Sequence, residues 1–297
     1  MNEGLTGELE WLNGRPLYAS LSGGKDSTAL GLWLKSQGIK FTPVFCDTGW
    51  EHPATYEYIA TVLEPLFGAF TVVRNEKLFQ DDPEWVGGME QGIRKFKMFS
   101  SGRHRWCSYY LKVLPAQNLL AEVQYTTGRK PVSAVGIRGA ESASRAKMTA
   151  TEEQDEATVW RPLLNWTESE VIELHARYNV RPNPLYLGGA SRVGCYPCIF
   201  ARKNEIRHLA ATAPERVQHI AALEERVTAL RQAATPGAAQ ATFFKSKRPD
   251  VAKMNIREVV EWSRTKGGEV IDDLAEQEEQ GCMRWGLCEV PRQEGDE

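Results

Sequence analysis

Hydrophobic and polar positions follow two alternating patterns in the first quarter of the chain. Short, mostly apolar runs at 16–19, 41–46 and 70–73 are each typical of a buried strand. Between them, residues 29–35 and 54–66 place apolar side chains at helical spacing. This strand–helix–strand–helix–strand order predicts a parallel sheet wound with helices, an α/β fold.

Later apolar runs extend the same prediction. Residues 132–137 predict a fourth strand, and residues 158–162 predict a fifth, edge-like strand. Residues 74–106 show no clear period and are expected to be irregular. Helical spacing predicts further helices at about 115–123, 167–178, 214–232 and, as one or two helices, 255–278.

The character of the chain changes after Pro182. Turn-forming residues fill 182–189, and they are followed by helical patterns and by most of the cysteines. We therefore predict an α/β domain at 1–182 and a cysteine-containing, mainly helical region at 183–297.

Composition narrows the class of protein. The chain has 297 residues and a formal net charge of −3, from 36 basic and 39 acidic side chains. A bulk electrostatic surface for nucleic acid is therefore not expected, although a local basic patch is compatible with these numbers. No apolar run approaches the length of a membrane span, and the first residues lack the pattern of a signal peptide. A cytoplasmic location is expected, in which the six cysteines serve as thiols or metal ligands rather than disulfides.

The segment Ser20–Thr28 has the composition of an anion site. It joins the first strand to the first helix through Gly23 and Gly24, which can adopt positive φ and let an oxygen approach the backbone. The start of the helix adds about half a positive charge, and phosphate is the usual occupant of such a position. Lys25 adds a point charge. The segment is not a Walker A loop, because Ala19 stands where that motif requires glycine.

Two further loops follow predicted strands. Asp47–Pro53 comes after the second strand, and Arg138–Arg145 comes after the fourth. Ligands of open α/β sheets bind at the carboxyl ends of strands, and arginine offers forked donors that suit phosphate. Both loops are therefore expected to line the same site as Ser20–Thr28.

Basic residues also gather in the stretch 74–106, where two interpretations are open. A solvated loop is the simpler one, and a substrate-facing basic path is the other. The residues concerned are Lys95, Lys97, Arg103, His104 and Arg105.

The cysteines include one Cys-x-x-Cys pair, Cys195 and Cys198, in a turn-forming sequence that suits chelation of one metal centre. Cys107, Cys282 and Cys288 are further candidate ligands. Four thiolates can hold a [4Fe–4S] cluster or a structural zinc ion, and unligated thiols are the third interpretation. Cys46 ends an apolar strand and is interpreted as a core residue, an interpretation that also stays open for Cys107.

Four of these stretches together resemble one family. Ser22–Thr28 is similar to the PP-loop, SGGxDS, of the ATP pyrophosphatases. With Asp47–Pro53, Arg138–Arg145 and the Cys-x-x-Cys pair, it resembles the phosphoadenosine phosphosulfate (PAPS) reductase branch of that superfamily. The resemblance covers roughly residues 16–200 and extends to the DNA-phosphorothioation sulfurtransferases. It implies a Rossmann-like α/β/α sandwich of the adenine nucleotide α-hydrolase type, with a [4Fe–4S] cluster.

The resemblance also implies roles for individual residues. The nucleotide would be bound by Ser20, Ser22, Gly23, Gly24, Lys25, Asp26, Ser27, Thr28, Asp47, Thr48, Gly136, Arg138, Glu141 and Ser142. The catalytic residues would be Lys25, Asp26, Arg138 and Arg145. The cluster would be held by Cys107, Cys195, Cys198 and Cys288, with Cys282 as the alternative fourth ligand.

One departure from the family affects the expected reaction. Sulfate-activating reductases carry a reactive cysteine in a terminal Glu-Cys-Gly-Leu-His motif, which this chain lacks. The leading hypothesis is therefore an ATP-dependent sulfurtransferase or related adenylating enzyme, using ATP, Mg²⁺ and a [4Fe–4S] cluster. A PAPS or APS reductase that forms sulfite is the second hypothesis. A non-catalytic nucleotide-binding component of a modification or defence complex is the third.

The expected partners follow from these hypotheses. A sulfurtransferase implies a sulfur donor such as a cysteine desulfurase, and its acceptor could be a nucleic acid. A reductase implies thioredoxin. A homodimer is compatible with both, and no membrane partner is expected.

Overall fold

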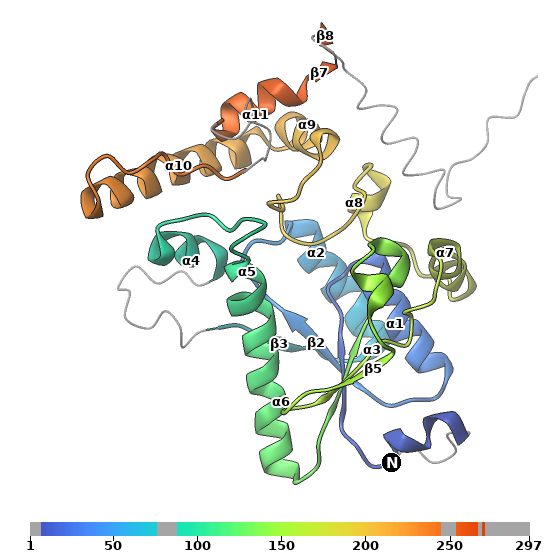
Figure 1. Cartoon of the computed structure of the whole chain (residues 1–297). Coiled ribbons are helices and arrows are strands. Elements are labelled where there is room, and N and C mark those ends of the chain that lie inside the picture. Colours follow the sequence, from blue (N-terminus) through green and yellow to red (C-terminus); the bar gives the residue numbers. More distant parts are fainter. Residues whose placement is uncertain (1–6, 76–87, 245–253, 267–268, 271–297) are drawn as a thin grey trace, which may run out of the picture.

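The computed structural model describes residues 7–75, 88–244, 254–266 and 269–270. Its main sheet has six strands in the order β3-β2-β1-β4-β6-β5. Neighbouring strands are parallel except β5, which runs antiparallel to β6. The strands are β1 (Leu17–Ser20), β2 (Thr42–Cys46), β3 (Thr71–Val73), β4 (Val132–Val135), β5 (Thr151–Glu153) and β6 (Thr158–Trp160). The predicted Rossmann-like sandwich with a mainly parallel sheet is confirmed (Figure 1).

Helices flank the sheet, and a further group of helices lies beyond its carboxyl edge (Figure 1). The flanking helices are α1 (Lys25–Ser36), α2 (Pro53–Tyr58), α3 (Glu64–Phe67), α5 (Trp106–Ser108), α6 (Leu114–Thr127) and α7 (Glu168–Arg177). The second group comprises α4 (Gly88–Phe96), α8 (Pro184–Leu187), α9 (Lys203–Thr212), α10 (Pro214–Ala234) and α11 (Ile256–Ser263). No described helix is both long and apolar enough to cross a membrane.

The strand order places the loops after β1 and β4 side by side. β1 lies between β2 and β4, with Ala19 in register with Pro43 on one side and with Ala134 on the other. The chain therefore winds outward in opposite directions from β1 and β4. Such a switch point is where open α/β sheets form a ligand crevice at their carboxyl edge.

The core of the sheet domain explains why these segments form strands and helices. Ala19 and Ala134 of the central strands are fully buried, together with Leu30 and Leu34 of α1. Val171 of α7 joins the same cluster, because α7 packs against α1. The small alanines let both central strands lie close to the helices on one face.

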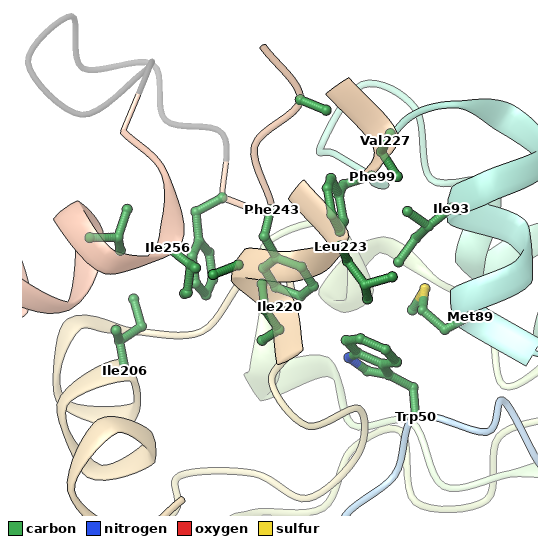
Figure 2. Close-up of a cluster of buried hydrophobic side chains, with 14 of the residues drawn as sticks. Trp50, Met89, Ile93, Phe99, Ile206, Ile220, Leu223, Val227, Phe243 and Ile256 are labelled. Atoms are coloured by element: carbon green, nitrogen blue, oxygen red, sulfur yellow. The ribbon is translucent and has the colours of Figure 1, made fainter. Parts of the chain in front are cut away.

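A second apolar cluster joins residues that follow β2 to residues of the helices after residue 203 (Figure 2). Trp50, from the loop after β2, and Met89 of α4 lie on one side of it, facing Leu223 of α10 and Phe243. All four side chains are buried. The boundary at residue 182 stays a prediction, but the described regions on its two sides share this cluster.

The structure corrects four details of the predicted elements. Residues 74–106 are not uniformly irregular, because α4 forms there with Met89 and Ile93 on its buried face. The helix expected from about Pro115 begins at Trp106 and passes through a π-helical turn at Tyr109–Val113 before α6.

The other two corrections concern the fifth strand and the last predicted helices. The fifth strand is not at the edge, since β5 pairs with its outer side. The predicted helices of 255–278 reduce to α11 in the described residues, where the hairpin β7 (Thr265–Lys266) and β8 (Glu269–Val270) follows.

Candidate functional site

The predicted phosphate loop connects β1 to α1 as a tight turn. Gly23 has a φ of +74°, which a residue with a Cβ rarely adopts, and its Cβ would lie 3.1 Å from Thr55. The Ser27 hydroxyl accepts from Ser22 N at 3.1 Å and donates to Gly24 O at 2.9 Å. The loop is therefore closed by its own side chains, with the amino end of α1 directed toward its mouth.

Residues from α7 and α8 hold this loop from behind. Lys25 N donates to the Tyr186 hydroxyl at 3.1 Å, and Asn183 Nδ2 donates to Gly23 O at 3.2 Å. His175 Nε2 lies 2.9 Å from Lys25 O. Burial lowers the pKa of His175, so the imidazole is neutral at pH 7. Sequence reasoning missed these supports, although the Asn183-Pro184 turn was visible.

The charges of the loop are paired within the protein. Asp26 Oδ2 lies 2.9 Å from Lys25 Nζ, and Asp26 Oδ1 accepts from Arg138 Nε at 2.5 Å. Lys25 Nζ also lies 3.3 Å from Glu168 Oε1. Lys25 and Arg138 are both buried. Three of the predicted catalytic residues therefore form one ion-pair network, while the fourth, Arg145, pairs with Glu141.

Gly136 brings the loop after β4 against the phosphate loop. A Cβ at this position would lie 2.8 Å from Asp26 O, closer than real Cβ contacts. Glycine is therefore required for the carboxyl end of β4 to approach the start of α1. The predicted meeting of the two loops is confirmed.

The loop after β2 places two carboxylates differently. Asp47 is buried, accepts from Gly49 N and the Tyr56 hydroxyl at 2.8 Å each, and pairs with Arg74. Glu51 accepts from Thr48 Oγ1 at 2.7 Å. The sequence pointed to Asp47, yet Glu51 lines the cavity and Asp47 does not.

His52 in the second loop both caps a helix and lines the cavity. Its Nδ1 accepts from Ala54 N at 3.0 Å, which caps α2, and its side chain also lines the cavity. Burial, with His208 and Arg216 nearby, lowers the pKa of His52. His52 is therefore a neutral hydrogen-bonding group at pH 7.

One cavity of about 1740 Å³ unites the loops. The predicted residues that line it are Ser20, Ser22, Gly24, Lys25, Asp26, Ser27, Thr48, Gly136, Arg138, Glu141, Ser142, Arg145, Cys107, Cys195 and Cys198. Gly23, Thr28 and Asp47 are not among the lining residues. Thr28 is fully buried in α1, and the carboxylate of Asp47 is bound by Gly49, Tyr56 and Arg74.

A second part of the cavity lining, the cysteine wall, consists of Cys107 and of the loop that carries Cys195 and Cys198. Their loop docks on Trp50, since Tyr196 N donates to Trp50 O at 2.7 Å and Trp50 Nε1 donates to Pro197 O at 3.2 Å. Arg216 covers the Trp50 ring, with its guanidinium carbon 3.7 Å from the ring centroid. Trp50 therefore fixes the Cys-x-x-Cys pair to the sheet domain, a role that the sequence did not reveal.

Burial raises the pKa of two thiols near Lys112, those of Cys195 and Cys46. It raises the pKa of Cys195 to about 11, against the opposing charge of Lys112. It also raises the pKa of Cys46 to about 11, which fits the interpretation of Cys46 as a core residue. Burial alone would lower the pKa of Lys112, but interactions with Cys195 and Glu51 outweigh burial and raise it. Lys112 is a further side chain of the cavity lining that sequence reasoning missed.

The predicted metal ligands are only partly assembled. Cys107, Cys195 and Cys198 line the same cavity, whereas Cys282 and Cys288 lie outside the described residues. Within the described part of the chain, no group of three or more Cys, His, Asp or Glu side chains is arranged to hold a metal ion.

The basic stretch divides between its two interpretations. Arg105 lines the cavity, with its guanidinium carbon 4.8 Å from the centroid of the Phe200 ring. Lys95, Lys97, Arg103 and His104 do not line it. Only one of these five side chains therefore lines the cavity.

Comparison with known proteins identifies the family. The family model of the phosphoadenosine phosphosulfate reductase domain matches residues 16–201. An uncharacterised 37.8 kDa protein of Escherichia phage 186 is 31% identical, over 91% of this chain and 96% of its own length. The adenosine 5'-phosphosulfate reductase of Deinococcus radiodurans is 29% identical, over 56% of this chain and 59% of that reductase.

A solved structure, the PAPS reductase of Candida auris in a phosphate complex, is similar with a TM-score of 0.45 and 20% identity. That similarity covers 64% of this chain and 87% of the other. Because the family model matches more than half of the sequence, this chain belongs to the phosphoadenosine phosphosulfate reductase domain family.

Proposed function

We propose that this protein is an ATP-dependent sulfurtransferase that activates its acceptor with AMP. One observation carries the proposal: the phosphate loop and three cysteines line a single cavity. A nucleotide bound by the loop would therefore lie in the same cavity as groups able to handle sulfur. ATP, with its pyrophosphate on the loop, fits this arrangement.

The proposed reaction has two steps. An acceptor oxygen attacks the α-phosphorus of ATP, and the bond from that phosphorus to the bridging oxygen breaks, which releases pyrophosphate. A donor sulfur then attacks the acceptor carbon or phosphorus and displaces AMP, which takes the acceptor oxygen with it. Lys25, Arg138 and the amides at the start of α1 would stabilise the charge on the leaving pyrophosphate.

Magnesium bound with the nucleotide would neutralise charge on the phosphates in this proposal. Asp26 and Asp47 are the carboxylates that the sequence suggests for it. Each has both oxygens engaged by protein groups, Asp26 by Lys25 and Arg138. Because both oxygens of Asp26 are already engaged, Asp26 would contact Mg²⁺ through water rather than as a direct ligand.

A [4Fe–4S] cluster is also part of the proposal. Its support is chemical: three thiols line one cavity, and the ammonium of Lys112 interacts with Cys107 and Cys195. Cys107, Cys195 and Cys198 would hold the cluster, with Cys288 or Cys282 as fourth ligand. When bound, the cluster would tie distant segments together and stabilise the fold.

The second candidate is a reductase that releases sulfite from PAPS or APS. The similarity to the Deinococcus radiodurans reductase favours it. Because this sequence has no Glu-Cys-Gly-Leu-His motif, the reactive thiol of such a reductase would have to be another cysteine, for which Cys288 is the candidate.

Product analysis separates the two candidates. Protein purified without oxygen is supplied with Mg²⁺, ATP, sulfide and short RNA and DNA acceptors, and pyrophosphate and AMP are measured. In parallel, sulfite is measured with PAPS or APS, thioredoxin and reductant. We expect AMP and pyrophosphate with little sulfite. Robust sulfite release that is lost in Cys288→Ser with full iron content would establish the reductase instead.

Metal analysis tests the cluster by itself. Cys195→Ser should lose iron, acid-labile sulfide and brown colour, and its melting temperature should fall. Cys46→Ser is the matched control, since Cys46 is a buried thiol outside the cavity lining and should keep its iron. Wild-type protein that contains zinc or no metal would contradict the cluster.

A further inference from the structure

Six arginines line the cavity: Arg216 covers the Trp50 ring, and the other five fall into two groups. Arg138 and Arg145 are neutralised by Asp26 and Glu141, at the phosphate loop. Arg105, Arg192 and Arg202 also line the cavity, and in the part of the chain that the structure describes none of them forms an ion pair. All three are exposed. The second group therefore has exposed guanidinium groups that no carboxylate pairs with in the described residues.

Glu205 connects the two segments that carry Arg192 and Arg202, and it forms no ion pair with either arginine in the described residues. One of its carboxylate oxygens accepts from the Ser191 hydroxyl at 2.8 Å, and the other accepts from Arg202 N at 2.7 Å. The segment of Arg192 is thereby tied to the start of α9. Both guanidinium groups remain available to an anion outside the protein.

Phe200 adds an aromatic surface to the same wall. It lines the cavity and is 43% exposed, which is unusual for a phenylalanine, and the guanidinium of Arg105 lies against its ring. Single exposed apolar side chains are common and need no explanation. An exposed ring in contact with an unpaired arginine is different, because it offers a stacking surface beside a positive charge.

The size of the cavity leaves room for a second ligand. Pockets for one small ligand or cofactor measure about 300–1,000 Å³. The cavity here is about 1740 Å³. A nucleotide on the phosphate loop would therefore leave room for a second ligand at Arg105, Arg192, Phe200 and Arg202. We call these four residues the arginine wall.

We propose that Arg105, Arg192, Phe200 and Arg202 bind single-stranded nucleic acid, which serves as the acceptor of the transfer. This inference rests on the proposed function and names its substrate class. The arginines would contact phosphates, and a base would stack on Phe200. A single strand is required because the bases of a duplex are already stacked on one another.

Fluorescence anisotropy tests the inference with the intact protein. The probes are fluorescein-labelled 12-nucleotide strands of thymidine and of uridine, and a DNA duplex of equal length. We expect both single strands, or one of them, to bind more tightly than the duplex. The two strands distinguish DNA from RNA as the source of the acceptor.

Variants assign the binding to this wall. Phe200→Ala should weaken binding about fivefold or more, whereas Phe200→Tyr should retain it. Arg192→Ala with Arg202→Ala should lower the slope of log affinity against log salt by about 1.4, which corresponds to two lost phosphate contacts on a single strand. The matched control is Arg257→Ala with Arg264→Ala, since both arginines are paired with glutamates and lie outside the cavity lining.

Several results would overturn the inference. These are no binding by folded wild type, equal affinity for the duplex, or an unchanged dissociation constant in Phe200→Ala. Competition by polyglutamate as effective as by unlabelled strand would assign the wall to an acidic protein segment. The proposed function fails separately: strand binding without pyrophosphate release contradicts the reaction and leaves this binding site standing.

Discussion

The two walls of the cavity satisfy their charges in opposite ways. At the phosphate loop, Lys25 and Arg138 are buried and paired with Asp26. At the cysteine wall, Lys112 forms no ion pair in the described residues, and neither do the exposed arginines. Both walls face the same cavity, but only one is electrostatically complete.

The difference teaches how the site divides its work. A wall with paired charges and a hydrogen-bonded backbone is preorganised for one ligand geometry. A wall with unpaired cations and partly buried thiols obtains its opposite charges from the ligand that it binds. We therefore expect substitutions at the phosphate loop and at its supports to cost stability, and substitutions at the arginine wall to cost binding.

The largest expected effect concerns the attachment of the cysteine wall. Trp50→Ala should reduce the free energy of unfolding by about 3–5 kcal/mol, because a fully buried tryptophan leaves a cavity. It should also speed alkylation of Cys195, whose loop docks on Trp50. Urea unfolding and mass spectrometry measure the two effects. Trp50→Phe is the control, and equal losses in both variants would contradict the docking role.

The second prediction compares two arginines of the same loop. Arg138→Ala should reduce the unfolding free energy by about 3 kcal/mol, because it removes one partner of a buried ion pair. Arg145→Ala should cost less than about 1 kcal/mol, since its pair with Glu141 is partly exposed. Thermal or urea unfolding compares the two. Similar losses would mean that the phosphate loop is not organised around Asp26.

Two glycines compare how tightly the walls are packed. Gly136→Ala should cost about 1–3 kcal/mol, because its Cβ would meet the backbone of Asp26 at 2.8 Å. Gly194→Ala, at the cysteine wall, should stay within about 0.5 kcal/mol, since no atom lies within 4 Å of its Cβ. Urea midpoints of the two variants measure the contrast, which an equal cost would remove.

The smallest expected effect is a pH dependence at the support of the phosphate loop. The pKa of His175 is lowered in the folded state, so the unfolded chain takes up a proton first as pH falls below 6.5. The stability contributed by neutral His175 is present above pH 6.5 and is lost toward lower pH. Between pH 7.5 and 5.5, wild type should lose more unfolding free energy than His175→Gln does. The exposed His104→Gln serves as control and should behave like wild type.

Local sequence predicts most of the fold and two parts of the site, the phosphate loop and the Arg138–Arg145 loop. Gly23 and Gly24 between an apolar run and a helical run identify the phosphate loop because strand, turn and helix are contiguous. The same holds for the Arg138–Arg145 loop, which follows its strand directly. Such features depend on neighbours in sequence, so they could be predicted before the fold was seen.

The supports of the site depend on contacts between distant segments. Nothing near Tyr186 or His175 indicates that both meet Lys25, 161 and 150 residues away. Lys112 reaches the cysteine wall only because the helix continues backward through Tyr109–Val113 to Cys107. The role of Trp50 likewise requires the Cys-x-x-Cys loop to return to it. Pairings of this kind follow from tertiary packing, which a single sequence does not display.

The shared apolar cluster also sets an order for biosynthesis. Trp50 leaves the ribosome long before its stacking partner Phe243, whose ring centroid lies 6.1 Å from its own in the finished protein. At bacterial or eukaryotic elongation rates that interval is roughly 10–40 s. Until α10 and the segment of Phe243 are made, Trp50, Ile93 and Phe99 lack these partners in the shared cluster. The nascent chain therefore exposes this apolar surface to aggregation and to chaperones until its later helices are made.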